Sequence, residues 1–267
     1  MNRLQKALLE MSELDRLTAM DSPVHRLSPL AKLLVTIIYI VVTVSFGKYD
    51  LSGLAVMVLY PVLAFSLSGI PVSTCFYKLR IAIPLVIFVG LFNPLFDKAP
   101  LLHIGNVAVS GGVVSMLTLV LKGIFSLMAS FILVATTPID RICAALRKLH
   151  VPSMLVTLLL LTFRYAGVMM QEAAVMSDAY RLRAPGQKGV HISAWGSFTG
   201  QLLLRSMDRA ERLYASMQLR GFRGEFDYAG PVPFTLRDAL FLIVCAAVFI
   251  LFRTVDIAAL IGGLFVR

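Results

Sequence analysis

The sequence is poor in charge and lacks the common motifs of nucleotide and hydrolytic chemistry. Only 15% of the 267 residues are charged and 58% are hydrophobic, whereas soluble domains average about 25% charged and about 45–50% apolar residues. No P-loop of the form G-x-x-x-x-G-K-S/T occurs, and neither H-E-x-x-H nor G-x-S-x-G occurs. The chain is therefore not expected to hydrolyse ATP itself, nor to act as a zinc protease or serine hydrolase.

Cysteine and histidine are scarce and scattered. The three cysteines, Cys75, Cys143 and Cys245, lie far apart, with no C-x-x-C pair and no closely spaced histidine. This spacing indicates neither a disulfide framework nor a zinc site. We expect the cysteines to be small buried side chains, and we expect this chain to bind no cofactor or metal.

Long uncharged runs are present instead, and the mean hydropathy is +0.83. A bilayer crossing needs about 20 apolar residues. Four runs precede residue 138, at 33–47, 51–70, 81–96 and 107–137, the last interrupted only by Lys122. A fifth region, 239–252, is followed by Arg253, Asp256 and a run at 257–266, which form a terminal hairpin or one long tilted helix. The pattern predicts an all-α polytopic membrane helical bundle of about 5–6 transmembrane helices.

The distribution of charged residues and of proline divides the chain into four regions. Residues 1–32 predict a cytoplasmic interfacial helix and a turn, and not a cleavable signal peptide, because acidic residues interrupt them. Residues 33–137 hold the four transmembrane helices, 138–230 a cytoplasmic set of amphipathic helices, and 231–267 the C-terminal transmembrane segment or hairpin. Within the third region, 151–163 is apolar but too short for a comfortable crossing.

The basic residues predict the orientation. The chain carries 25 Lys and Arg against 15 Asp and Glu. Five basic residues lie in 1–32 and two in the loop around residue 79, against one in each of the two alternate loops. The positive-inside rule therefore places the N-terminus in the cytoplasm. Twelve basic residues then fall in the cytoplasmic region 138–230, so the excess charge reports topology and lipid head groups, not nucleic acid.

Three helices are predicted in the cytoplasmic region. The first opens at Pro138 and reaches Leu149, and the second runs from about Ser153 to Arg183 before Ala184-Pro185-Gly186. The third runs from about Ser197 to Arg220 and stops at Gly221. It carries an apolar stripe that we expect to pack and a neighbouring basic face: Leu203, Met207, Ala210, Tyr214 and Met217 form the first, and Arg205, Arg209, Arg212, Ser216 and Arg220 the second.

Two arginines stand at the ends of predicted helices. Arg183 lies in Leu182-Arg183-Ala184 and Arg220 in Leu219-Arg220-Gly221. A guanidinium at a helix end can enter a groove of a partner protein, where its planar fork suits carboxylates and carbonyls. A solvated basic face, or one resting on anionic lipid, is the alternative reading of the same residues.

These parts, in this order, resemble the transmembrane (T) component of energy-coupling factor transporters, especially the CbiQ type that serves cobalt and nickel uptake. The resemblance covers most of the chain. It is carried by Leu14-Asp15-Arg16-Leu17, Val24 through Leu33, Pro138 through Pro152, and most specifically Arg205-Ser206-Met207-Asp208-Arg209-Ala210-Glu211-Arg212 leading into Met217-Gln218-Leu219-Arg220-Gly221-Phe222.

The resemblance implies that two short Ala-Arg-Gly-like motifs on coupling helices dock into two ABC-type ATPase subunits. By position the second is Leu219-Arg220-Gly221 and the first is Leu182-Arg183-Ala184, with Arg181 as an alternative for the first arginine. Both depart from Ala-Arg-Gly in their flanking residues. Arg205, Arg209, Arg212 and Glu211 would support the coupling helices.

The implied protein is a non-catalytic coupling subunit in a bacterial or archaeal cell membrane. ATP and Mg²⁺ would bind the ATPases, and a small CbiM-like membrane subunit (the S component) would capture Co²⁺ or Ni²⁺. A T component of a vitamin transporter is the nearest alternative. A stand-alone carrier or channel, suggested by Lys122, Asn93 and Asp256 at apparent membrane depth, and an enzyme acting on lipid head groups are alternatives of other classes.

Overall fold

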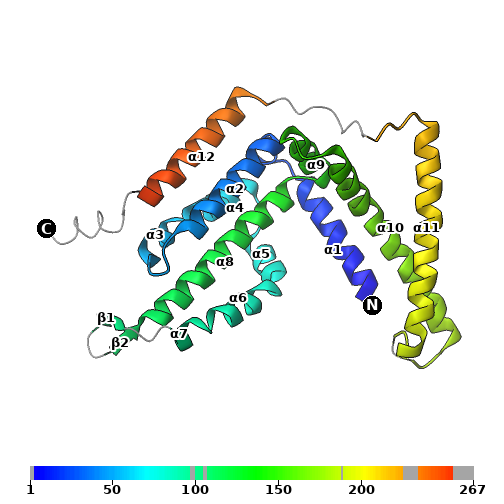
Figure 1. Cartoon of the computed structure of the whole chain (residues 1–267), viewed down its shortest axis with the longest axis horizontal. Helices are drawn as coiled ribbons and strands as arrows, with labels where there is room; N and C mark the ends of the chain where they lie inside the picture. The colour runs from blue at the N-terminus through cyan, green and yellow to red at the C-terminus, as the bar shows by residue number, and fades with distance from the viewer. Residues whose placement is uncertain (1–2, 97–99, 105–106, 188, 225–233, 255–267) are drawn as a thin grey trace. The chain divides into compact units, whose positions relative to one another are not determined.

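The computed structural model describes residues 3–96, 100–104, 107–187, 189–224 and 234–254. Figure 1 shows its helices and its one described pair of strands. In chain order these are α1 (Arg3–Thr18), α2 (Pro29–Ser45), α3 (Leu51–Val56), α4 (Leu59–Ser68), α5 (Val72–Leu79), α6 (Ala82–Gly90), α7 (Asn93–Phe96), β1 (Pro100–Ile104), β2 (Val107–Ser110), α8 (Gly111–Thr136), α9 (Ile139–Lys148), α10 (Ser153–Arg183), a 3-10 turn η1 (Ile192–Ala194), α11 (Trp195–Leu219) and α12 (Leu236–Thr254).

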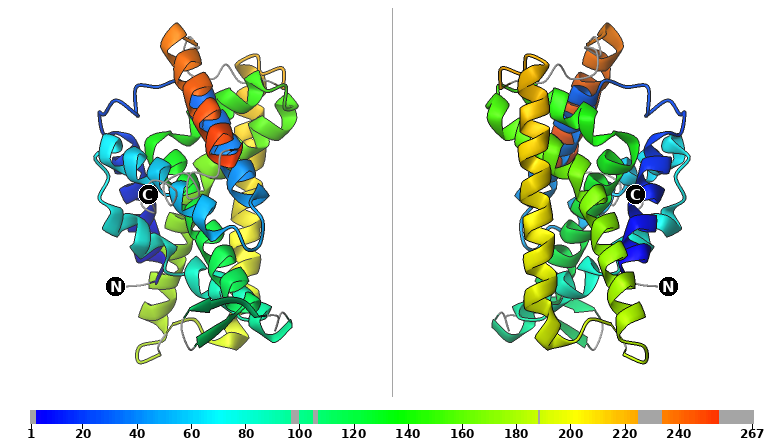
Figure 2. Two further views of the ribbon diagram at one scale, coloured as in Figure 1. Left: turned by 90° about the vertical axis from the view of Figure 1, so that its left-hand side faces the viewer. Right: turned by 90° about the vertical axis from the view of Figure 1, so that its right-hand side faces the viewer.

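The contacts divide the chain into two units. The first comprises Met1–Arg16 and Pro138–Pro231, and the second comprises Leu17–Thr137 and Val232–Arg267. In the first unit, α9 contacts α10 and α10 contacts α11. In the second, α8 contacts α2, α3, α4, α5, α6 and α7, while α12 lies along α2 (Figures 1 and 2). The cytoplasmic and membrane assignments of these regions stay predictions.

The all-α membrane bundle expected from the sequence is confirmed. By length and composition, three described helical segments can cross a membrane: Leu51–Ser68, Gly111–Thr136 and Ser153–Arg183. A fourth crossing is possible if α5 and α6, bent by 65° at their junction, act as one span, and α2 is a shorter apolar helix. Asp256 and the run 257–266 lie outside the described residues.

Two details of the predicted spans differ from the structure. The run at 81–96 is not one helix, since α6 ends at Gly90 and a separate short α7 follows. The helix predicted from about Ser153 to Arg183 is observed as the 31-residue helix α10. The difference concerns its apolar start at 151–163, which is judged too short to cross by itself, whereas the whole helix is long and apolar enough to cross a membrane.

An aromatic cluster lies at the centre of the second unit. The Tyr39 ring centroid is 4.6 Å from that of Tyr60 and 5.2 Å from that of Phe249, and the Tyr60 and Phe249 centroids are 5.1 Å apart. The buried Tyr39 hydroxyl donates to the Met57 carbonyl oxygen at 2.9 Å. The cluster therefore joins α2, α4 and α12, which are separated by up to about two hundred residues in sequence.

Small residues allow α6 and α8 to approach closely. A Cβ atom added at Gly123 would lie 2.7 Å from a methyl group of Val86, and one added at Gly90 would lie 3.3 Å from Val120. Glycine at both positions therefore permits the contact, as expected for helices that associate in a membrane by van der Waals packing.

The N-terminal end of α2 is bonded by a buried carboxylate from α12. Asp238 is only 4% exposed, and its Oδ1 accepts from the backbone N–H of Ser28, the N-cap of α2, at 2.8 Å. Its Oδ2 accepts from the backbone N–H and the hydroxyl of Thr235 at 2.9 and 2.7 Å. One acidic side chain thus satisfies donors at the starts of two helices, where the helix dipole also favours negative charge.

Lysine and arginine side chains donate hydrogen bonds to the carbonyl oxygens at the C-terminal ends of α2 and α8. The Lys122 ammonium of α8 donates to the carbonyl oxygens of Val44, at 3.1 Å, and Phe46. Arg253 of α12 donates to the Ser45 carbonyl at 3.3 Å. In the opposite direction, the buried Lys32 of α2 donates to the Thr136 carbonyl at the end of α8, at 2.8 Å. The last carbonyl oxygens of a helix have no hydrogen-bond donors within the helix itself, and these side chains provide donors for them.

The described cysteines behave as small apolar side chains. Cys75 and Cys143 are buried, Cys245 is half-buried, and all three are free thiols. Cys143 packs with Val156 and Leu160 where α9 meets α10. The expectation of buried hydrophobic cysteines is confirmed at Cys75 and Cys143.

Replacing Asp238 with asparagine tests the bond between α2 and α12. An amide nitrogen cannot accept hydrogen bonds from the Thr235 donors, so we expect Asp238→Asn to cost about 1–3 kcal/mol of stability. The measurement is thermal unfolding of the purified protein in detergent, with Asp208→Asn on exposed α11 as the control. An unchanged midpoint for Asp238→Asn would show that this carboxylate does not hold the two helix starts together.

Candidate functional site

Helix α10 ends at the first predicted docking arginine. Arg183 is the last helical residue, and the N–H of Ala184 donates to the Tyr180 carbonyl at 3.0 Å before Pro185 stops the helix. The Arg183 side chain is exposed and Leu182 is 85% exposed. Arg181 is also exposed and forms an ion pair with Asp178 of the same helix at 3.7 Å. Arg183 therefore lies at the end of the helix, whereas Arg181 lies within its last turn.

Helix α11 ends at the second predicted docking arginine. Arg220 is the C-cap, and Gly221 has φ +81°, a left-handed conformation that side chains rarely adopt. The N–H of Phe222 donates to the Met217 carbonyl at 3.0 Å and the N–H of Gly221 to the Gln218 carbonyl at 2.9 Å. This pair of bonds is a Schellman motif. The glycine in Leu219-Arg220-Gly221 is thus required by the backbone that ends the helix.

The two helix ends share one arrangement. In each, an exposed arginine follows a leucine that is almost fully exposed, with Leu219 at 90%. An exposed leucine exposes apolar surface that could be buried against a partner, at about 25 cal/mol per Å². A guanidinium beside it adds five directed donors. Each helix end can therefore contribute both apolar contact and charge-assisted hydrogen bonds to a partner.

A partly buried acidic residue, Glu172, joins α10 to α11. Glu172 of α10 forms an ion pair and hydrogen bond with Arg205, and its second oxygen lies 3.9 Å from Arg209. The Glu172 side chain is 23% exposed, less than either arginine. Two of the predicted supporting arginines are thus brought together on one carboxylate, while Glu211 and Arg212 are exposed elsewhere on α11. Sequence reasoning missed Glu172, because its partners lie 33 and 37 residues away.

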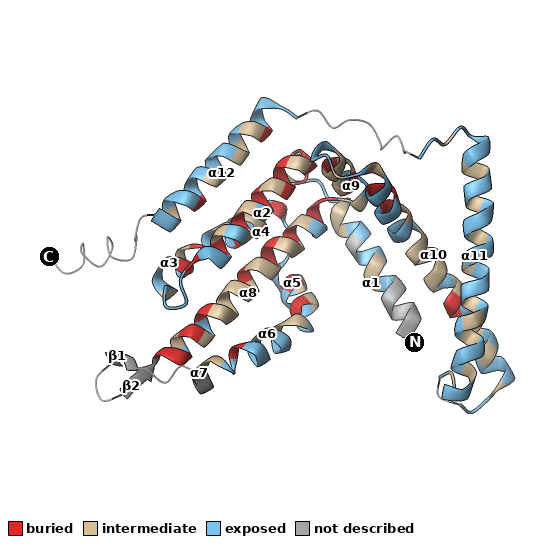
Figure 3. Ribbon diagram, viewed as in Figure 1, coloured by how far each residue is buried: buried red, intermediate tan, exposed pale blue. Residues whose placement is uncertain are grey.

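The apolar stripe of α11 does not pack within the described part of the chain. No residue of α11 is buried (Figure 3), and Leu203, Met207 and Tyr214 are 61%, 54% and 56% exposed. The expectation that this stripe packs is therefore wrong for the chain alone. Helical spacing identifies an amphipathic face, but it does not say whether the covering surface belongs to the same chain.

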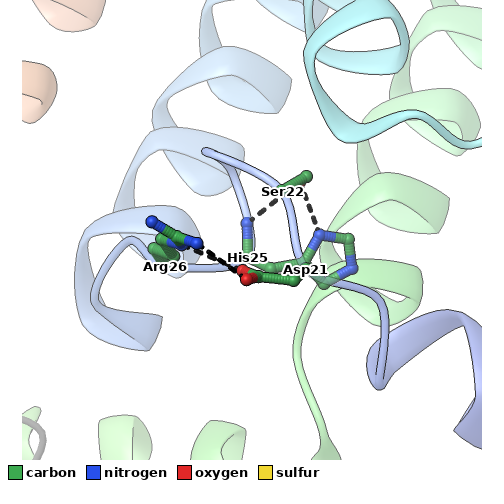
Figure 4. A network of polar contacts seen from close by, with 4 residues as sticks. All are labelled: Asp21, Ser22, His25 and Arg26. Atoms are coloured by element: carbon green, nitrogen blue, oxygen red, sulfur yellow. Dashed lines mark hydrogen bonds and ion pairs between the residues drawn. The ribbon is translucent and has the colours of Figure 1, made fainter.

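The turn before α2 is held by its own polar contacts (Figure 4). Arg26 donates to both carboxylate oxygens of Asp21 at 2.9 and 2.7 Å. The hydrogen bond and charge of Arg26 lower the pKa of the exposed Asp21. The buried His25 ring lies 2.7 Å from the Ser22 hydroxyl and 3.1 Å from the Leu17 carbonyl oxygen. These contacts fix the turn that leads into α2. Part of the Val24–Leu33 segment therefore has a structural role in this turn, apart from any role in binding a partner.

Two of the three residues that suggested a stand-alone carrier, Lys122 and Asn93, have structural partners, and the third, Asp256, lies outside the described residues. Lys122 bonds to the end of α2 as described above, and the Asn93 amide donates to the Ser115 hydroxyl at 3.2 Å. Among the described residues, no group of three or more His, Cys, Asp or Glu side chains could hold a metal ion.

A family model described as "CbiQ: Cobalt transport protein" matches residues 20–228. The energy-coupling factor transporter transmembrane protein EcfT of Lactococcus lactis is 27% identical over 219 residues, covering 76% of this chain and 82% of the relative. The cobalt transport protein CbiQ of Rhodobacter capsulatus is 28% identical, covering 64% and 70%. The nickel permease LarQ of Lactiplantibacillus plantarum is 32% identical over a shorter segment, covering 44% and 43%.

The Glu172 ion pairs predict a fixed spacing between α10 and α11. Replacing Glu172 with glutamine removes the charge that holds two arginines, so we expect the distance distribution between the helices to broaden. Spin labels at the exposed positions Val175 and Leu204, with the native cysteines replaced by alanine, measure it by pulsed electron resonance. Asp178→Asn is the matched control, since its ion pair lies within α10. Equal widths for the two variants would contradict a bridging role for Glu172.

Proposed function

The chain belongs to the CbiQ family and is a T component of an energy-coupling factor transporter, and from this premise we propose that it couples ATP hydrolysis to substrate release. In this proposal two cytoplasmic ABC-type ATPases bind ATP and Mg²⁺, and this chain is the non-catalytic subunit between them and an S component. The relatives named above are membrane subunits of transporters, which supports a subunit role over a stand-alone carrier.

One observation supports the docking role most directly. Arg183 and Arg220 are both exposed at the C-terminal ends of helices, each next to a leucine that is at least 85% exposed. Arginine at such a position can reach a groove in each of two ATPases, where carboxylates or carbonyls would accept its forked donors. Two such ends on one chain suit a pair of ATPase subunits.

The helices that carry these ends are long, with 31 residues in α10 and 25 in α11. At 1.5 Å per residue, the 31 residues of α10 and the 25 of α11 span about 46 and about 37 Å. The ion pairs of Glu172 join them at one place, where Arg205 and Arg209 of α11 meet this carboxylate of α10. When the ATPase pair closes and opens, it would displace the ends of α10 and α11. The two helices would then move together and would move the S component. Leu182, Ala184, Leu219 and Gly221 complete the two docking motifs, and Arg205, Arg209, Arg212 and Glu211 support them.

The proposed cargo is Co²⁺ or Ni²⁺. The family description names cobalt transport, and two of the relatives are named for cobalt and nickel. The ion would be bound by the CbiM-like S component, so it is substrate of the complex and not a resident of this chain. The EcfT relatives leave a vitamin transporter as the second candidate. The chain would lie in a bacterial or archaeal cell membrane as a multi-pass protein with its N-terminus in the cytoplasm.

Charge reversal at both helix ends tests the docking proposal. We expect Arg183→Glu with Arg220→Glu to leave membrane insertion intact and to reduce ATPase co-purification at least tenfold, because each substitution places a carboxylate against the proposed acceptors. Lysine at both positions should give an intermediate loss, since it lacks the bidentate fork. The measurement is the ATPase content of complexes isolated in mild detergent.

Arg141→Glu on the exposed face of α9 is the charge-reversal control, and Arg181→Glu decides between the two candidate arginines of the first motif. If the double variant retains its ATPases at full stoichiometry, the assigned docking role is wrong. If Arg181→Glu abolishes binding and Arg183→Glu does not, the first docking arginine is Arg181.

Radioactive metal uptake tests the cargo. We expect cells that express the chain with its ATPases and S component to accumulate Co²⁺ or Ni²⁺ in an ATP-dependent manner, and the docking double variant to reduce uptake to background. Flux of either ion through the purified chain alone in liposomes without ATP would contradict the coupling role. ATP-dependent uptake of a vitamin, with neither metal transported, would assign the complex to the vitamin class.

A further inference from the structure

An apolar hollow opens in the second unit beside α2. It has a volume of about 160 Å³ and is bounded by four helices. Its walls include Tyr60, Leu63 and Ala64 of α4 and Phe241 and Cys245 of α12, with Lys32 of α2 at one end. Nearly all of the surface that lines it is hydrocarbon.

A second hollow of about 190 Å³ adjoins the first. Its walls include Leu59 on one side and Val244, Val248 and Phe252 of α12 on the other. Tyr60, Leu63 and Cys245 line both hollows. The two hollows adjoin at these residues and are together named the α4–α12 groove, which follows α12 for more than two turns and has Tyr60 and Phe249 of the aromatic cluster among its walls.

Water is a poor occupant of this groove. A buried water needs two to four polar partners, and the few polar groups at its end are already used, since Lys32 donates to Thr136. The outer faces of both helices are apolar, with Leu63, Leu67 and Val244 at 51%, 56% and 51% exposed. In a membrane protein such faces meet lipid, and the groove opens between them. An acyl chain is the hydrocarbon that the surroundings supply.

The N-terminal end of α12 offers a place for a lipid head group. A wide surface hollow there is lined by Asp21, Arg26, Leu236, Arg237 and Asp238. Asp21 is paired with Arg26, and both oxygens of Asp238 accept hydrogen bonds from the protein. Hydrogen bonds from neutral donors leave the charge of Asp238 in place, and that charge interacts with the buried cation Lys32. The exposed Arg237 then adds one further positive charge to this hollow, one turn from Phe241 in the groove. An anionic phosphate suits this position.

We propose that the α4–α12 groove is a binding site for one acyl chain of an anionic phospholipid, with the lipid phosphate at Arg237. The lipid would fill the space between α4 and α12 and complete the packing around Tyr60. The site is independent of the ATPase-docking role, because it lies in the second unit and involves none of the docking residues.

Native mass spectrometry of the full chain, stripped of lipid in detergent and titrated with phosphatidylglycerol, tests the site. We expect one tightly bound lipid per chain. Ala64→Phe places a ring in the groove and should weaken binding at least tenfold, whereas Leu85→Phe on the exposed side of α6 should leave it unchanged. Equal binding by Ala64→Phe and the parent protein, or no tightly bound lipid on the parent, would overturn the proposal.

The head-group assignment is tested with phosphatidylcholine as the competitor. We expect the parent protein to prefer phosphatidylglycerol about tenfold, and Arg237→Gln to reduce this preference to about twofold or less, with Arg141→Gln as the control. An unchanged preference in Arg237→Gln would overturn the head-group part. If Ala64→Phe instead releases a small membrane protein and keeps the lipid, the groove holds a partner helix and the proposal is wrong.

A second variant covers the case in which Ala64→Phe does not fold. Leu63 is half-exposed, so Leu63→Trp can be accommodated, and Trp195→Phe removes the single native tryptophan. Brominated phosphatidylglycerol should quench the new tryptophan and saturate at one equivalent. Quenching that rises without saturation in the folded protein would mean bulk lipid only and would overturn the proposal.

Discussion

The described structure of the second unit depends on closing the ends of helices with charged side chains from other helices. In hydrocarbon an unpaired backbone N–H or carbonyl costs several kcal/mol. Asp238 supplies acceptors at the start of α2, and Lys122 and Arg253 supply donors at its end. The signs agree with the helix dipole at both ends. Because the partners come from α8 and α12, each bond also ties α2 to a neighbour.

In the first unit, by contrast, helices α10 and α11 end in local backbone motifs, and α11 buries none of its residues. Arg183 and Arg220 are left exposed at those ends, with an exposed leucine beside each. A chain that belongs to a family of multi-subunit transporters is expected to leave uncovered the surfaces that its partners need. The backbone groups at the ends of α2 are bonded by side chains of the same chain, whereas the apolar stripe of α11 is left exposed.

Local signals were sufficient to predict the ends of the long helices. Ala184-Pro185-Gly186 and Gly221 stop α10 and α11 where the sequence indicates, because proline and left-handed glycine act within one turn of themselves. Long-range partners could not be predicted in this way. Lys122 is read from sequence as a possible path residue, yet it bonds to carbonyls 76 and 78 residues earlier. Glu172 and Asp238 were missed for the same reason, since their roles depend on which helices meet.

Isolation of the tagged chain from its native membranes tests the coupling role. We expect P-loop ATPases and one small membrane protein to co-purify in mild detergent and to be identified by mass spectrometry. Metal bound to that small protein would also name the cargo. Recovery of the chain alone, under conditions that keep other membrane complexes intact, would contradict the coupling role and favour an autonomous carrier.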